Sequence, residues 1–549
     1  MNIKHFTAIT LLPFCSYRHT EVSRLSYSSV IALSLQLHSS YTRWILSLAI
    51  LLVASVAQSA VIDRNWCRYQ SSGFELVTDL GEVRAHELIH DLELFRSSTS
   101  KMMNTTSVVS RPVKTVVFSR QKDFHKVFDM KPFVGFMRPS LVANLLILGP
   151  GPEGDYLNAT AFHEYTHHLL RSRGLASYPS WYEEGFATYL ASLEFSEHEL
   201  TLGADNIYRV QSRPKRALAH SAKHLGRSSK DRPFKGLSIR KIFELKNPIN
   251  LPRHQIGSFY EKSWLLVHMF NLGHLSGLPD RRQALTTYLE KLNSGFPQKE
   301  AFDLAFGVSY RSLEKNLKRY ASRKQLPSIK LPVAEALHYK IQKLGCMDRS
   351  EIAYELGIAS AYQNPPYAHS LFSEAIASNG LDSDLHVGLS LVSRYQGNID
   401  DARSHAQSAV EMDFKNVFAK VQLANVLLDS CRRSPDETCG KTWAEATTLY
   451  RQAMRQEPSR IDAVFGLGVT YLYTGQPGEA VNYLRVAHRR APWAPRINLY
   501  LGESYRLIGD EKKARTHLTN ALRWEPRDVW RKRAQDALDM LELKPSADR

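Results

Sequence analysis

Apolar and polar positions in the first third of the chain alternate between the spacing of strands and that of helices. Phe74–Thr78 is short and rich in β-branched and apolar residues, which predicts a strand, and Glu82–Met103 follows with helical spacing. Val113–Ser119 predicts a second strand, Gln121–Phe128 a helix and Leu141–Leu148 a third strand. This order predicts a mixed α+β region.

Further helical patterns follow this region. They cover Asn158–Arg173, Ser180–Phe195, Ser258–Leu272, Asp280–Leu292 and Tyr310–Arg323. Pro327 and Pro332 then predict a linker, because proline interrupts regular structure.

The last third of the chain repeats itself. A set of small and aromatic residues recurs after 34 positions: Gly468, Tyr471, Gly475, Ala480, Leu484, Ala487 and Pro492 return as Gly502, Tyr505, Gly509, Ala514, Leu518, Ala521 and Pro526. A period of 34 residues resembles the tetratricopeptide repeat, and five units with a capping helix from Asp528 fit the pattern. The resemblance implies a solenoid whose concave groove binds a peptide or protein partner. The alternative is a solenoid that only stabilises the neighbouring domain.

Composition and charge narrow the class of protein. With 549 residues and 43% hydrophobic positions, the chain can bury two or three cores. Its net charge of +17 is concentrated in residues 207–246, which contain twelve Lys and Arg residues and only two acidic residues, Asp231 and Glu244. Such a stretch suits nucleic acid, anionic lipid or an acidic substrate, or is a solvated loop. No nucleic-acid-binding motif accompanies it, so nucleic acid is disfavoured.

An export signal is predicted near the N-terminus. Arg43 precedes an apolar run, Trp44–Val56, and the small residues Ala57 and Ser59 follow. This order predicts a periplasmic or secreted protein with cleavage after Ser59. The run is short for a membrane span, and the alternative is a membrane anchor formed by residues 44–61.

Cysteine use agrees with export. Cys67, Cys346, Cys431 and Cys439 follow the signal, without a CxxC pair. Cys431 and Cys439 lie in a ten-residue insertion, around Ser430–Gly440, that interrupts the repeat register. They could form a disulfide in an oxidising compartment.

A metal-binding motif lies in the helix predicted at Asn158–Arg173. His163-Glu164-Tyr165-Thr166-His167 is an HExxH, in which residues four apart share a helix face and both imidazoles can hold one zinc ion. Glu164 can then accept the proton of an attacking water. A second HExxH occurs at His86-Glu87-Leu88-Ile89-His90.

The surroundings of the two motifs differ. Sixteen residues separate His167 from Glu184, which lies in Trp181-Tyr182-Glu183-Glu184-Gly185-Phe186-Ala187. This segment resembles the WxxEGxA segment of gluzincin metallopeptidases, and the resemblance implies that Glu184 is the third zinc ligand. No such segment follows His90, whose nearest carboxylates lie on the same helix. We therefore expect one zinc ion, held by His163, His167 and Glu184, and none at His86.

A third motif extends the resemblance. Tyr260-Glu261-Lys262-Ser263 resembles the YEKG segment of the aminopeptidase-N-like gluzincins, whose tyrosine stabilises the oxyanion. The similarity runs from His163 to about Gly273, and the arrangement before tetratricopeptide repeats looks like the bacterial peptidase-MA-like proteins. It implies that Glu164 and Tyr260 are catalytic.

Two departures from that family limit what the resemblance implies. The chain lacks a GxMEN segment, so exopeptidase activity does not carry over. Thr188 stands where thermolysin-like enzymes place a carboxylate that orients a histidine, and its hydroxyl can still accept a hydrogen bond.

These patterns predict a leader at 1–59, an α+β zincin-like domain at 60–345 and an all-α solenoid at 346–549. The predicted function is that of an exported zinc endopeptidase whose repeats recruit a protein substrate or partner. Leu141–Leu148 is expected to be the edge strand that pairs with an extended substrate. The alternative is a weakly active or inactive zincin shell that serves as a protein-binding scaffold.

Overall fold

The computed structural model describes residues 61–542 except for a set of internal gaps. The gaps are 104–111, 132, 139, 142–143, 152–156, 173–177, 197, 205–236, 246–247, 249–250, 333–338, 381 and 525–527. The predicted signal at 43–59 and most of the basic stretch at 207–246 lie outside the described residues. No helix within the described ranges is long and apolar enough to cross a membrane.

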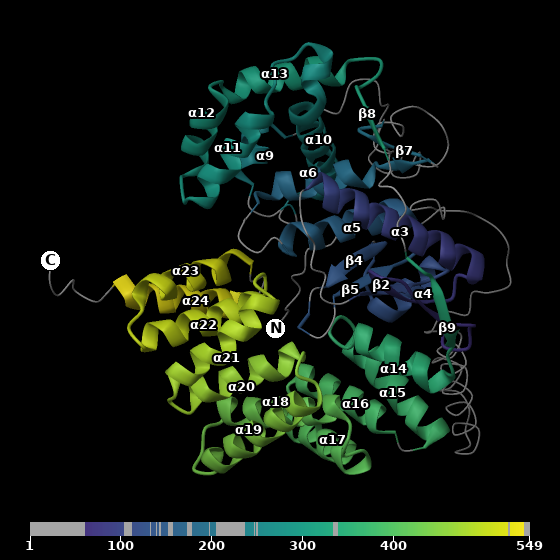
Figure 1. Cartoon of the computed structure of the whole chain (residues 1–549), viewed down its shortest axis with the longest axis vertical. Helices are drawn as coiled ribbons and strands as arrows, with labels where there is room; N and C mark the ends of the chain where they lie inside the picture. Colours follow the sequence, from purple (N-terminus) through teal and green to yellow (C-terminus); the bar gives the residue numbers. More distant parts are fainter. Residues whose placement is uncertain are drawn as a thin grey trace, which may run out of the picture.

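A six-stranded sheet lies between the helical lobe at the top of Figure 1 and the helices α14 (Arg349–Ser360) and α15 (Pro365–Asn379) below it. Its strands, in spatial order, are β4 (Gly135–Arg138), β5 (Leu145–Leu148), β3 (Val113–Val117), β2 (Phe74–Thr78), β1 (Cys67–Gln70) and β9 (Gln342–Cys346). Strands β5, β3 and β2 are parallel, whereas β4, β1 and β9 each run antiparallel to their neighbours.

The prediction of the edge strand is wrong. Leu145–Leu148 forms β5, which lies between β3 and β4, and all four of its residues are buried. The edge strand beside β5 is the short strand β4, which ends in the half-buried Arg138, and β9 forms the opposite edge of the sheet. An uninterrupted apolar run marks a strand covered on both faces and therefore a central one, which is why the pattern misidentified the edge.

Helices cover both faces of the sheet. On one face α3 (Glu82–Met102) and α5 (Leu157–Ser172) pack on Leu146 and Leu148 in a common core. On the other face Leu145 and Ile147 lie in a second core with α4 (Gln121–Phe128). The alternation follows from the two-residue period of a strand.

The first repeat helices belong to that second core. Helices α14 (Arg349–Ser360) and α15 (Pro365–Asn379) contribute Leu356, Leu371 and Phe372 to it. Glu355 of α14 also forms ion pairs with Arg68 at 2.9 Å and Lys114 at 2.5 Å. The sheet and the first repeat therefore form one packed unit across the expected boundary at residue 345.

A mostly helical lobe follows α5. It contains α6 (Ser180–Ala191), α9 (Ile239–Glu244), α10 (Arg253–Leu272), the 3₁₀ helix η2 (Gly273–Ser276), α11 (Arg282–Asn293), α12 (Gln298–Phe306) and α13 (Tyr310–Ala321). A small sheet in the order β6 (Glu194–Phe195), β7 (Glu199–Leu202) and β8 (Ile329–Pro332) completes it. The predicted linker at Pro332 is wrong, because Pro332 ends β8 and pairs with Glu199. The helix predicted to reach Phe195 ends at Ala191.

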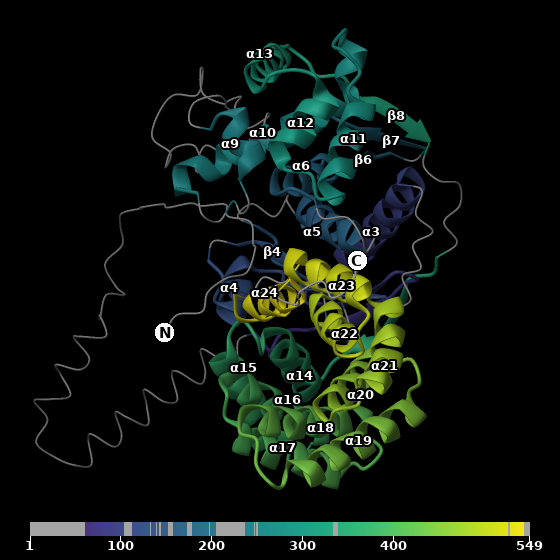
Figure 2. The same cartoon turned by 90° about the vertical axis from the view of Figure 1, so that its left-hand side faces the viewer.

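The repeat region consists of five helix pairs and a cap. After α14 and α15 come α16 (Ser383–Gln396) and α17 (Ile399–Met412), α18 (Val417–Arg433) and α19 (Cys439–Gln456), α20 (Ile461–Tyr473) and α21 (Pro477–Arg490), α22 (Pro495–Leu507) and α23 (Glu511–Trp524), then α24 (Asp528–Glu542). Figures 1 and 2 show these helices as an arc that begins under the sheet at α14 and α15, descends to α17–α19 and rises again through α20–α24.

The 34-residue period has a packing cause. A Cβ atom at Gly468 would lie 2.8 Å from Leu484 Cγ, and one at Gly502 would lie 2.7 Å from Leu518 Cγ. A leucine at one repeat position therefore packs on a glycine at another, and this contact recurs in successive repeats. The predicted repeat structure is confirmed.

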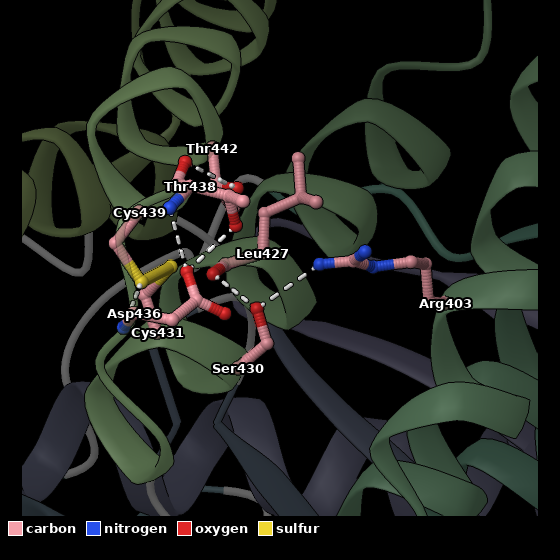
Figure 3. Close-up of a disulfide and its surroundings, with 8 residues drawn as sticks. All are labelled: Arg403, Leu427, Ser430, Cys431, Asp436, Thr438, Cys439 and Thr442. Atoms are coloured by element: carbon pink, nitrogen blue, oxygen red, sulfur yellow. Dashed lines mark hydrogen bonds between the residues drawn. A yellow bond between two sulfur atoms is a disulfide. The ribbon is translucent and has the colours of Figure 1, made fainter.

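Disulfides join two pairs of cysteines. Cys431 and Cys439 close the turn between α18 and α19, with their Cα atoms 5.5 Å apart (Figure 3). Asp436, within the same turn, accepts hydrogen bonds from the amide and hydroxyl of Thr438 (Figure 3). The second disulfide, Cys67–Cys346, joins β1 to β9 across 279 positions, and the sequence analysis did not predict it.

Candidate metal centre

Helix α5 is buried on all sides along the HExxH motif, since residues 161–170 are all buried. His163, Glu164 and His167 are buried, at 5%, 5% and 7% exposure. The intervening Tyr165 packs instead against Phe74 and Phe95 in the sheet core. His163 and His167 therefore lie on the helix face opposite Tyr165, two positions away from it in each direction.

Helix α6 brings Glu184 to the same place. Its approach depends on Gly185, because a Cβ atom there would lie 2.4 Å from the backbone oxygen of Ser263 on α10. The absence of a side chain at Gly185 lets α10 pack directly on α6. This contact accounts for glycine immediately after the carboxylate.

Three ligand-type atoms converge between α5 and α6. His163 Nε2 lies 3.1 Å from His167 Nε2, and Glu184 Oε2 lies 3.3 Å and 3.6 Å from these two nitrogen atoms. These three residues are the one group within the described ranges whose His, Cys, Asp or Glu ligand atoms cluster in this way.

Both imidazoles are oriented by hydrogen bonds at Nδ1. His167 Nδ1 lies 3.2 Å from Glu183 Oε1, which is also 3.3 Å from Arg171 Nη2. His163 Nδ1 lies 3.4 Å from Thr188 Oγ1, whose hydroxyl donates to the Glu184 carbonyl oxygen at 2.8 Å. With protons on both Nδ1 atoms, both Nε2 lone pairs face Glu184.

The charges of the group favour a bound cation. Burial alone would lower the pKa of the His167 imidazole, but Glu184 and Glu183 raise it to about 10. Burial alone would raise the pKa of the Glu184 carboxyl, yet the histidines hold it below its ordinary value. Burial also opposes ionisation of Glu183, whose pKa is nevertheless lowered by His167 and Arg171. The group thus contains two carboxylates, Glu183 and Glu184, that stabilise positive charge on the neighbouring imidazoles.

The donor set fits zinc. Zinc–nitrogen distances of about 2.0–2.1 Å in a tetrahedron place neighbouring ligand atoms about 3.3 Å apart, close to the separations observed. Glu184 Oε2 is buried and accepts no hydrogen bond of regular geometry within the described residues. Two imidazoles and one carboxylate would leave one position of the tetrahedron open, as catalytic zinc sites require.

Glu164 is held by the edge strand. Its Oε2 accepts a hydrogen bond from the backbone N–H of Met137 on β4 at 3.0 Å. Strand β4 can approach α5 because Gly135 has no side chain, since a Cβ atom there would lie 2.8 Å from Thr160 Cγ2. The predicted base, the predicted metal ligands and a sheet edge therefore lie together.

Tyr260 lies on the face of α10 that meets α6. It is three residues before Ser263, so the two share a helix face, and its ring packs against Phe259 in the core. The next residue, Glu261, is partly buried, and this burial raises its pKa to about 7. Tyr260 is thus about one helical turn from the backbone contact beside Glu184.

The second HExxH has different surroundings. His90 is exposed and its Nδ1 is hydrogen-bonded to the hydroxyl of Tyr339, while the ring of His86 packs against Tyr69. Within the described residues no third ligand joins this pair.

Sequence reasoning missed two residues of the site. Glu183 could have been predicted as a partner of His167. Arg171 lies one helical turn after His167, so a carboxylate next to Glu184 could contact both side chains. Met137 acts through its backbone N–H, and no side-chain pattern identifies such a donor.

Residues 349–542 form a tetratricopeptide-like helical repeat domain. Solved structures similar to the chain include TTC0263, a thermophilic TPR protein of Thermus thermophilus, at 21% identity, covering 34% of this chain and 98% of that one with a TM-score of 0.31. MamA AMB-1 matches at 18% identity, covering 32% and 99% with a TM-score of 0.25. Pseudomonas aeruginosa PilF matches at 16% identity, covering 36% and 89% with a TM-score of 0.29. No protein-family model and no curated protein matches the chain.

Proposed function

We propose that this chain is a zinc-dependent endopeptidase whose repeats bind its protein substrate or partner. One observation carries the proposal: His163 Nε2, His167 Nε2 and Glu184 Oε2 meet at 3.1–3.6 Å beside a buried glutamate and a sheet edge. A purely structural zinc site has no use for the glutamate, whereas hydrolysis requires a general base.

His163, His167 and Glu184 would hold the metal, and Glu183 and Thr188 would keep the imidazoles oriented toward it. Bound zinc supplies Lewis acidity, which polarises a carbonyl oxygen and makes water more acidic.

Glu164 is the proton carrier of the proposed reaction. Met137 N–H occupies its Oε2, which leaves Oε1 to take a proton from the attacking water and to return it to the leaving amine. Its burial keeps bulk water from competing for that proton.

The outer edge of β4 would align the substrate. Strand β4 pairs with β5 on one side, and an extended peptide added on the other side would run beside Glu164. This assigns to β4 the role first expected of Leu141–Leu148. Tyr260 is the proposed donor to the oxyanion, on the resemblance of its segment and its place on α10.

Export is part of the proposal. Two disulfides are stable in an oxidising compartment, which agrees with the predicted signal at 43–59. Peptides from an exported chain should begin at or after residue 60, and a membrane-retained chain that keeps residues 44–61 would favour the anchor instead.

The direct test combines metal content with cleavage. Purified chain should hold about one zinc, which His163→Ala and Glu184→Ala remove and His86→Ala leaves in place. Proteome-wide mapping of cleavage sites should find products with the wild type and none with Glu164→Gln. Loss of zinc from His86→Ala alone would refute the assignment.

The alternative function is a protein-binding scaffold. Its support is the size of the repeat domain, five helix pairs and a cap. A chain that binds zinc and a protein partner, yet cleaves neither that partner nor a broad peptide library, would establish this alternative.

A further inference from the structure

Strand β4 contacts both Glu164, the proposed base, and the repeats. Because β4 pairs only with β5 in the described sheet, few hydrogen bonds hold it in place. Met137 N–H nevertheless donates to Glu164 Oε2 at 3.0 Å. The position of β4 therefore determines how that carboxylate is held.

The residue after Met137 reaches into the repeats. Arg138 Nη1 donates to Gln363 Oε1 at 2.8 Å, and Nη2 lies 3.4 Å from the carbonyl oxygen of Ile358. Ile358 belongs to α14 and Gln363 to the turn before α15, so both partners come from the first repeat. Arg138 is half-buried, and burial lowers the pKa of its guanidinium.

The loop after β4 makes a second contact with the arc of repeats. Leu141 packs against an apolar cluster formed by α20, α21 and α22, which includes Val464 and Ile497. The segment that leaves β4 therefore touches the first repeat through Arg138 and the fourth and fifth repeats through Leu141. Figure 1 shows β4 and β5 above the arc that these repeats form.

We infer that Arg138 is a positioning residue through which the first repeat holds β4, and with it Glu164, in place. The catalytic part of this inference rests on the proposed function. The mechanical part does not, because it concerns only contacts between β4 and the repeats. The physical reason is that an edge strand frays readily on its unpaired side, and a charge-assisted hydrogen bond to a packed repeat opposes that fraying.

Amide hydrogen exchange of the metal-free, full-length chain tests the mechanical part. Arg138→Met keeps most of the side-chain volume and removes both hydrogen bonds, so amides 135–138 should exchange roughly tenfold faster. Gln363→Ala should reproduce the effect, because it removes the partner of the same bond. Arg349→Met is the matched control, since Arg349 also joins the repeats to the N-terminal region, at Asp63, without touching β4. Equal exchange at 135–138 in Arg138→Met and Arg349→Met would overturn the inference.

Kinetics test the catalytic part. Arg138→Met should lower kcat about tenfold with KM within twofold, while Arg138→Lys should recover part of the loss because the ammonium can still reach Gln363. Unchanged kcat in Arg138→Met would remove Arg138 from the positioning of Glu164. If the wild-type chain hydrolyses nothing, the proposed function fails, and the exchange measurement still decides whether the first repeat holds β4.

Discussion

A Cβ atom at Gly185 would lie 2.4 Å from the backbone oxygen of Ser263. This contact sets the separation of α6 and α10, and Glu184 is the residue next to it. The third candidate ligand is therefore positioned by packing between two helices rather than by its own hydrogen bonds.

Gly185→Ala should consequently disturb both stability and metal binding. The added methyl group forces α6 away from α10, at a cost of roughly 1–3 kcal/mol, and displaces Glu184 from the histidines. Thermal unfolding and zinc content of the purified variant measure the two effects. Gly257→Ala is the control, because Gly257 also lies on a helix but has nothing within 4 Å of its Cβ position. Full zinc content and an unchanged melting temperature in Gly185→Ala would contradict this account.

Glu183→Gln should weaken zinc binding without unfolding the chain. The amide keeps the size of the side chain but removes the charge that orients His167 and raises its pKa. Loss of such an outer partner reduces metal affinity by about 10–100-fold. Competition with a chromogenic chelator gives the affinity, and Glu194→Gln, an exposed substitution on β6, is the control. Equal affinities of Glu183→Gln and wild type would show that Glu183 does not orient the ligand.

Tyr260→Phe separates catalysis from packing. If the phenol donates to the oxyanion, kcat should fall by roughly 10²–10³ with KM, zinc content and melting temperature nearly unchanged. If the ring only packs in the core with Phe259, turnover should stay within a few-fold of the wild type. Steady-state kinetics on a peptide found by cleavage mapping decides between the two.

The stability of the chain should depend on pH through Glu261. Its pKa in the folded state is raised to about 7 by burial, so the folded state holds the proton more tightly than the unfolded state does. The free energy of unfolding should therefore fall as the pH rises from about 4.5 to about 7, where the unfolded carboxyl is ionised first. Glu261→Gln lacks this loss, so its melting temperature relative to wild type should be higher at pH 8 than at pH 4.5. The same difference at both values would argue against a buried, protonated Glu261.

Truncation should reveal that the first repeats are part of the N-terminal core. A chain that ends at Asp348 loses α14 and α15 and exposes the sheet face that contains Val116 and Ile147. It should aggregate or bind a hydrophobic dye, since exposed apolar patches of this kind promote association. A chain that ends at Met412 keeps the first two helix pairs and should stay monomeric and retain zinc. A stable, monomeric chain ending at Asp348 would show that the sheet needs no cover from the repeats.

Local patterns were sufficient for much of this structure. The strand Phe74–Thr78 and the helix Gln121–Phe128 have their predicted bounds, because apolar periodicity depends on burial of one side of an element. The repeats were predictable because the contact between Gly468 and Leu484 recurs one period later between Gly502 and Leu518. His163 and His167 could be named because four-residue spacing on a helix places two imidazoles on one face. Glu184 was named from the resemblance of its segment to the WxxEGxA segment of gluzincins.

Other features depended on contacts between distant segments. Periodicity identifies the apolar strand Leu145–Leu148 but carries no information on which strands lie beside it, so the edge was placed wrongly. The pairing of Cys67 with Cys346 required the fold to bring β1 and β9 together. Two hydrogen bonds likewise join groups that are far apart in the chain. Met137 N–H donates to Glu164, and Arg138 donates to Gln363 of the first repeat. The residue spacing determined which side chains could meet on one helix, and packing between helices and strands decided which groups surround them.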